Sequence, residues 1–156
     1  MRQLPAGVLA PDFRLLALNG QELRLSEAIA DRPVVLAFYK SSCPTCQLTF
    51  PYLQRIYSEF RAEPVFTIWG ISQDEFAETT EFVHEYGIQF DILIDEHPYT
   101  VSAAYGLEFV PTIFVVGTDG KIKISDYGFS KATLSEIAKP LRLFGADDGL
   151  PATRPG

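Results

Sequence analysis

The sequence of residues 34–46 is VVLAFYKSSCPTC. Its first part, residues 34–39, is a continuous apolar run without alternation, which is typical of a central strand covered on both faces. Its last part holds Cys43 and Cys46, the only cysteines of the chain, and an amphipathic helix pattern begins at Pro44. The stretch therefore predicts a buried strand that brings two thiols to a helix N-terminus, within disulfide reach of each other.

Strand and helix patterns alternate on both sides of this stretch. Upstream, two short apolar segments flank Asn19-Gly20, a strong hairpin signal, and Ser26 is expected to cap a short helical turn. Downstream we expect helix 44–60, strand 65–71, helix 74–86 closed by Gly87, strand 90–94, helix 99–105 ending at Gly106, strands 111–116 and 121–126, and a last helix marked by apolar residues from 134 to 144 and ending at Gly145. The order predicts one α/β domain over residues 1–145 and a disordered tail over 146–156.

Composition and charge narrow the function classes. The chain has 156 residues and a net charge of -7, with no basic cluster that could neutralise phosphates, so a nucleic-acid partner is not expected. No stretch approaches membrane-spanning length, and the N-terminus lacks the patterns of a signal or transit peptide. We expect a soluble cytoplasmic protein, a monomer or weak dimer, without a membrane partner or a cofactor.

The cysteine count limits the chemistry further. A disulfide-rich secreted domain would need more cysteines, and a structural zinc site would need about four ligands. The chain has two cysteines and two histidines far from them. A C-x-x-C pair in a chain of alternating strands and helices predicts a thioredoxin-like redox motif, with no bound metal.

The two cysteines can be given separate roles. A thiolate is the attacking species, and the free N–H groups and dipole of a helix N-terminus stabilise negative charge at Cys43. Cys43 is therefore the expected nucleophile, and Cys46, one turn along and more buried, would resolve the mixed disulfide. Pro44 suits the first helical position, and Thr45 can offer its N–H or hydroxyl to the thiolate. Lys40 is a candidate for stabilising that thiolate by its charge, although a lysine near a strand end is usually only solvated.

The order of elements, the cysteine pair and Val110-Pro111-Thr112 together resemble the thioredoxin superfamily, within it the TlpA-like thiol-disulfide oxidoreductases and the related AhpC/TSA redoxins. The resemblance includes an N-terminal β-hairpin and a helix and strand inserted between Gly70 and Gly106. It implies a central mixed sheet flanked by helices. It also implies that the Val110-Pro111 bond is cis, that Pro111 packs against the cysteines, and that the Val110 backbone pairs with a substrate segment. The partners would be protein disulfides or dithiols, or a thioredoxin-type reductant.

Two positions depart from the usual thioredoxin pattern. Ser42 stands where many relatives carry a tryptophan, which removes an apolar lid. Ala37 stands where thioredoxin carries a buried acid that takes the proton of the second cysteine. Water or another group must then accept the proton of Cys46.

Two alternatives remain open from the sequence. In a peroxiredoxin-type thiol peroxidase, Cys46 would be the peroxidatic residue and Cys43 the resolving one, yet no arginine occurs between Arg61 and Arg142 to polarise a peroxide. In a copper-delivery module, the cysteines would bind the metal together with a distant histidine such as His97, although such relatives space their cysteines more widely.

Overall fold

The structure is a computed structural model that describes residues 2–139. Its centre is a mixed five-stranded sheet in the order β5-β4-β3-β6-β7. The strands are β3 (Val34–Tyr39), β4 (Thr67–Ser72), β5 (Asp91–Ile94), β6 (Thr112–Val116) and β7 (Ile122–Tyr127). Strand β3 runs parallel to β4 and antiparallel to β6, and all six of its residues are buried. The predicted central strand is confirmed at the expected residues.

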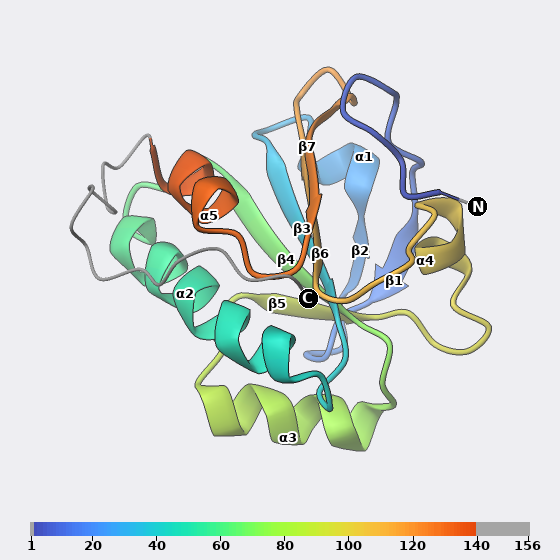
Figure 1. Cartoon of the computed structure of the whole chain (residues 1–156), viewed down its shortest axis with the longest axis vertical. Coiled ribbons are helices and arrows are strands. Elements are labelled where there is room, and N and C mark those ends of the chain that lie inside the picture. Colours follow the sequence, from blue (N-terminus) through green and yellow to red (C-terminus); the bar gives the residue numbers. More distant parts are fainter. Residues whose placement is uncertain (1, 140–156) are drawn as a thin grey trace.

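Helices cover both faces of this sheet (Figure 1). On one face lie α2 (Pro44–Phe60), α3 (Phe76–Tyr86) and α5 (Lys131–Ala138), over a core that contains Cys46, Phe50 and Tyr39. The other face is covered by the hairpin of β1 (Arg14–Leu16) and β2 (Glu22–Arg24), α1 (Leu25–Ala28) and α4 (Thr100–Ala104). This arrangement is the one that the sequence predicts, including the inserted α3 and β5.

Local differences from the sequence prediction have physical reasons. Helix α1 begins at Leu25, one residue before the predicted cap, so Ser26 lies inside the helix. The Ser26 N–H is satisfied by the Asp12 carboxylate at 2.8 Å, and Asp12 also pairs with Arg24. Asp12, which is distant in sequence, thus caps the start of α1 in place of Ser26. Helix α5 is described only to Ala138, so the rest of the predicted last helix and the tail 146–156 lie outside the described residues.

None of the described helices is long and apolar enough to cross a membrane.

Two helix ends use glycine in the left-handed region. Gly87 closes α3 with φ 62°, as predicted, and a side chain there would meet no atom within 4 Å. Gly106 follows α4 with φ 68°, and a Cβ there would collide with the backbone of Arg2. The N-terminal segment is held against this end of α4 by the Leu4 N–H, which bonds the Tyr105 carbonyl at 3.1 Å.

The two glycines therefore provide a matched stability test. Gly87→Ala should lower the free energy of unfolding by about 1 to 2 kcal/mol, the ordinary cost of the left-handed region for a residue with a Cβ. Gly106→Ala should cost clearly more, because the clash with Arg2 adds to the same conformational cost. Urea denaturation measures both values, and equal losses would contradict the close packing of the N-terminal segment at Gly106.

Candidate active site

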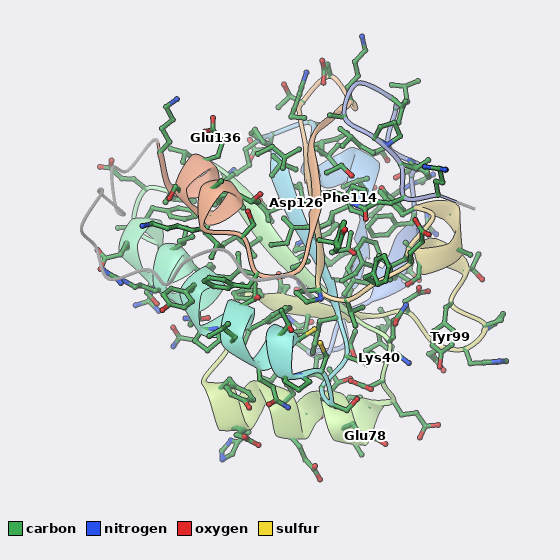
Figure 2. All side chains as sticks on the ribbon, in the orientation of Figure 1. Lys40, Glu78, Tyr99, Phe114, Asp126 and Glu136 are labelled. Atoms are coloured by element: carbon green, nitrogen blue, oxygen red, sulfur yellow. The ribbon has the colours of Figure 1, made fainter. Side chains whose placement is uncertain are left out.

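Cys43 is the N-cap residue of α2, directly after the loop that leaves β3. Its sulfur accepts a hydrogen bond from the Cys46 backbone N–H at 3.4 Å, and its own N–H bonds the Lys40 carbonyl at 3.2 Å. Cys43 is half-buried. The sulfur atoms lie at the N-terminal end of α2, close to the end of β3 (Figure 2). A thiolate formed here would accept a backbone hydrogen bond and lie at the positive end of a helix of 17 residues.

Cys46 lies three residues further along the helix and is fully buried. Burial raises the pKa of its thiol well above the ordinary value, the Lys40 backbone N–H opposes this effect, and the Cys43 sulfur and the Asp74 carboxylate add to it. Cys46 therefore stays protonated at neutral pH while both cysteines are free thiols, which is their state in this structure. Cys43 is thus the more exposed of the two thiols and Cys46 the more buried one.

The loop of Val110 and Pro111 lies opposite the cysteines, and the bond between these two residues is cis. The Cys43 thiol donates a hydrogen bond to the Val110 carbonyl over 3.4 Å. Residues 67 positions apart in the sequence thus meet at the reactive sulfur, as the resemblance implies. The Pro111 carbonyl is held by the Gly128 N–H at 2.8 Å, which fixes this loop to the segment that follows β7.

The supporting residues are placed differently from one another. Pro44 opens α2, as predicted. Thr45 makes no described hydrogen bond to the Cys43 sulfur, because the donor that faces this sulfur is the N–H one residue later in the helix. Lys40 is exposed and forms no ion pair among the described residues.

Asp74 is a residue that the sequence reasoning missed. Its carboxylate accepts a 2.7 Å hydrogen bond from the Ser41 N–H in the loop before Cys43. Asp74 follows β4, which runs parallel to β3, so the carboxyl ends of these two strands lie at the same end of the sheet. That adjacency could have been inferred from the predicted topology. Ala37 is buried in β3, so the proton acceptor of thioredoxin is absent there, and Asp74 is the carboxylate held against the active-site loop.

Tyr39 adds a buried polar group to the same region. Its ring packs on Phe50 of α2 with centroids 4.4 Å apart, and its hydroxyl has no hydrogen-bond partner among residues 2–139. The Ser72 hydroxyl is near but bonds Thr79 at 2.8 Å. Burial raises the pKa of this phenol, and the charges of Asp74 and Cys46 act in the same direction.

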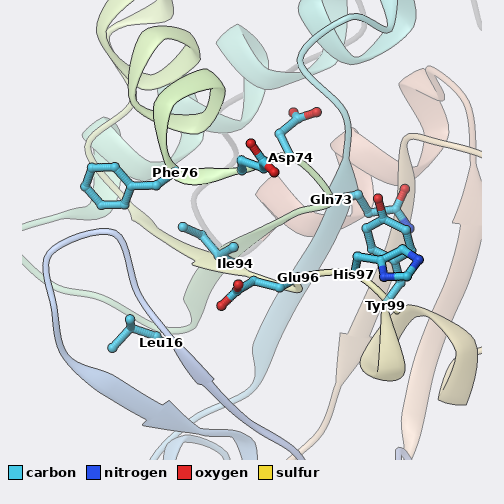
Figure 3. Close-up of a pocket in the computed structure, with 9 residues that line it drawn as sticks. Leu16, Gln73, Asp74, Phe76, Ile94, Glu96, His97 and Tyr99 are labelled. Carbon is cyan, nitrogen blue, oxygen red and sulfur yellow. The ribbon is translucent and has the colours of Figure 1, made fainter.

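A cavity of about 410 Å³ has Asp74 in its lining. Figure 3 shows His97 and Tyr99 at one end of it and Phe76 at the other. The His97 ring is exposed and lies edge-on to Tyr99, with centroids 5.5 Å apart. Across residues 2–139, the structure brings no three His, Cys, Asp or Glu side chains together in a way that could hold a metal ion.

The burial of Cys46 makes stability depend on pH. The folded state holds this thiol protonated, whereas the unfolded chain releases the proton above its ordinary pKa of about 8.5. The reduced protein should therefore lose stability as the pH rises above about 8.5, by at most about 1.4 kcal/mol per pH unit for this one proton.

Urea unfolding of the reduced protein between pH 7 and 9.5 measures this slope. The tyrosines Tyr39 and Tyr105, whose pKa values are also raised by burial, start to contribute only near pH 10. Cys46→Ala has no thiol at this position and should show a shallower slope, whatever its absolute stability. An unchanged slope in this variant would contradict a protonated, buried Cys46.

Comparisons with known proteins agree with this geometry. The AhpC/TSA family matches residues 6–125. The thiol-disulfide oxidoreductase ResA of Halalkalibacterium halodurans is 28% identical over 88% of this chain and 77% of its own length. The peroxidoxin BcpB of Mycobacterium tuberculosis is 28% identical, with a TM-score of 0.73 over 92% of this chain and 99% of its own.

A further solved structure supports the fold alone. A protein from Bacteroides thetaiotaomicron, described as a putative protein disulfide isomerase, superposes with a TM-score of 0.82 at 19% identity, over 92% of this chain and 93% of its own. The N-terminal hairpin, the central mixed sheet and the cysteine pair at the start of α2 are thus those of a thioredoxin-like redox enzyme. The chain belongs to the AhpC/TSA family, in the redoxin branch of the thioredoxin superfamily that includes the thiol-disulfide oxidoreductases.

Proposed function

We propose that this protein is a thiol-disulfide oxidoreductase that exchanges disulfides with protein partners through Cys43 and Cys46. One observation carries the proposal. The sulfur of the half-buried Cys43 accepts a backbone N–H at the start of α2, while Cys46, one turn later, is fully buried with a raised pKa. This difference separates an attacking thiol from a resolving thiol, which is what a dithiol exchange requires.

The reduction of a partner disulfide proceeds in two exchange steps. The Cys43 thiolate attacks one sulfur of the partner, a new S–S bond forms, and the second partner sulfur leaves as a thiolate that takes up a proton. Cys46 then loses its proton and attacks the Cys43 sulfur, which frees the partner as a dithiol and leaves a Cys43–Cys46 disulfide. A dithiol reductant of the thioredoxin type would regenerate the pair, and the same steps in reverse would oxidise a partner.

Ionisation of Cys43 also prepares the docking loop. In this structure the Cys43 thiol donates a hydrogen bond to the Val110 carbonyl, whereas a thiolate has no proton to donate. The carbonyl therefore becomes free when the nucleophile forms, and we propose that an extended segment of the partner then pairs with the Val110 backbone beside Pro111. Binding of the partner and activation of Cys43 would in this way favour each other.

A peroxidase is the second candidate, because the chain belongs to the AhpC/TSA family and is similar to a peroxidoxin. That reaction would make Cys46 the residue that attacks peroxide. Its attack requires a thiolate that peroxide can reach, whereas Cys46 is fully buried and its pKa is raised. The geometry therefore favours disulfide exchange through Cys43.

Trapping of mixed disulfides tests the proposed roles. Cys46→Ser lacks the resolving thiol and should accumulate mixed disulfides through Cys43 with a peptide disulfide, visible by mass spectrometry. The wild-type protein should instead release a reduced peptide, and Cys43→Ser should form no adduct and have background reductase activity with dithiothreitol as the electron source. Hydrogen peroxide consumption that is lost in Cys46→Ser and kept in Cys43→Ser would establish the peroxidase instead.

A further inference from the structure

Two exposed aromatic rings lie beside the active-site loop and have no role in the core. Phe109 is 53% exposed and Tyr127 is 49% exposed, and their rings stack at an interplanar angle of 26° with centroids 5.0 Å apart. Phe109 directly precedes Val110, whose carbonyl faces the Cys43 sulfur. Tyr127 ends β7, an edge strand, opposite Thr112 of β6. The stacked pair is therefore an exposed surface that begins one residue before Val110, whose carbonyl contacts the Cys43 sulfur.

This surface is held in place by hydrogen bonds on both sides. The Phe109 carbonyl accepts from the Thr112 hydroxyl at 2.6 Å, and the Tyr127 N–H donates to Asp126 at 2.8 Å. Asp126 in turn accepts from the Thr133 hydroxyl at 2.5 Å at the start of α5. Two stacked rings on a fixed loop lose little conformational entropy when a ligand covers them.

Two acidic residues and one arginine line a cavity beside the rings. A cavity of about 300 Å³ lies against the pair, and its lining includes Glu108 and Asp126, with Arg2 as a cation. Glu108 is exposed, and a single weak hydrogen bond of 3.3 Å from the Gln3 N–H reaches its carboxylate. The lining thus holds more negative than positive charge, on a chain whose net charge is -7. Aromatic faces attract cations as well, since the ring quadrupole is negative on its face.

We propose that the Phe109–Tyr127 pair and Glu108 form a specificity surface that selects partner segments with an arginine or lysine beside the disulfide cysteine. The inference rests on the proposed function. The cationic side chain lies over the stacked rings, with its charge near Glu108, while the neighbouring partner backbone pairs at Val110. A planar guanidinium fits best, because it stacks on a ring and pairs with a carboxylate at once.

Three peptide disulfides that differ only in the residue next to the cysteine test the preference. The probe residue is Arg, Leu or Glu, and the readout is kcat/KM for reduction with dithiothreitol as the electron source. The wild-type protein should reduce the Arg peptide roughly 3- to 30-fold faster than the Glu peptide, the size that an exposed cation–π contact and one exposed ion pair supply together. The kcat/KM for the Leu peptide should lie between the values for the Arg and Glu peptides. Added salt should reduce the difference in kcat/KM between the Arg and Glu peptides.

Variants locate the preference on the surface. Glu108→Gln removes one charge from an exposed side chain and should reduce the Arg-to-Glu ratio and its salt dependence. Tyr127→Ser should lower kcat/KM for the Arg peptide more than for the Leu peptide. If the Tyr127→Ser protein does not fold, Glu108→Gln alone tests the surface. The matched controls Glu78→Gln and Phe76→Ser change an exposed acid and an exposed aromatic residue on α3 and should keep the wild-type ratio.

Two outcomes separate failure of this inference from failure of the proposed function. If the wild-type protein reduces hydroxyethyl disulfide and all three peptides but does not favour Arg, or favours Leu over Arg, the specificity surface is wrong and the exchange activity stands. If it reduces neither the peptides nor hydroxyethyl disulfide, the proposed function is wrong. A preference for Arg that Glu108→Gln leaves at full strength would also overturn the role given to Glu108.

Discussion

The first turn of α2 has backbone N–H groups that no helix residue can satisfy, and a sulfur atom occupies the place where an oxygen usually caps them. Ser, Thr, Asp and Asn are the preferred residues at an N-cap because their oxygens are good acceptors, whereas sulfur is a weak one. Cys43 accepts the Cys46 N–H over 3.4 Å, which is a poor cap for a neutral thiol. An ionised acceptor makes a shorter and stronger hydrogen bond with the same kind of donor than a neutral one does. The hydrogen bond from the Cys46 N–H to the Cys43 sulfur thus both caps α2 and contacts the proposed nucleophile.

The depth of the two cysteines follows from the helix that carries both. Cys43 lies outside the first turn and beside the Val110 loop, whereas Cys46 points into the core between β3 and α2, with Tyr39 and Phe50 around it. The same packing that stabilises α2 therefore keeps Cys46 protonated. In the proposed exchange, Cys46 gives up its proton after Cys43 has formed the mixed disulfide, when no negative charge at Cys43 opposes the ionisation of Cys46.

The core and the cysteine positions could be predicted from the sequence because they depend on local patterns. The apolar run of β3, the helical spacing of α2 and Gly87 at the end of α3 each carry their own signal, and the structure has them at the predicted residues. The cis bond before Pro111 came only from the family resemblance. Capping of the Ser26 N–H by Asp12 had no local signal at all, because the two residues are 14 positions apart and meet only when the chain folds.

The residues that the sequence reasoning missed share a place in the fold. Asp74 follows the end of β4, Phe109 precedes β6, and Tyr127 ends β7. All three lie at the end of the sheet where the last residue of β3 is found. Parallel β3 and β4 bring their carboxyl ends there, while antiparallel β6 begins where β3 finishes. Side chains at strand ends can change without disturbing the buried sheet. This end of the sheet can therefore vary in charge and shape around a constant cysteine pair. Under the proposed function, residues such as Glu108 and Tyr127 would set the selectivity for partners, while Cys43 and Cys46 would keep the same exchange chemistry.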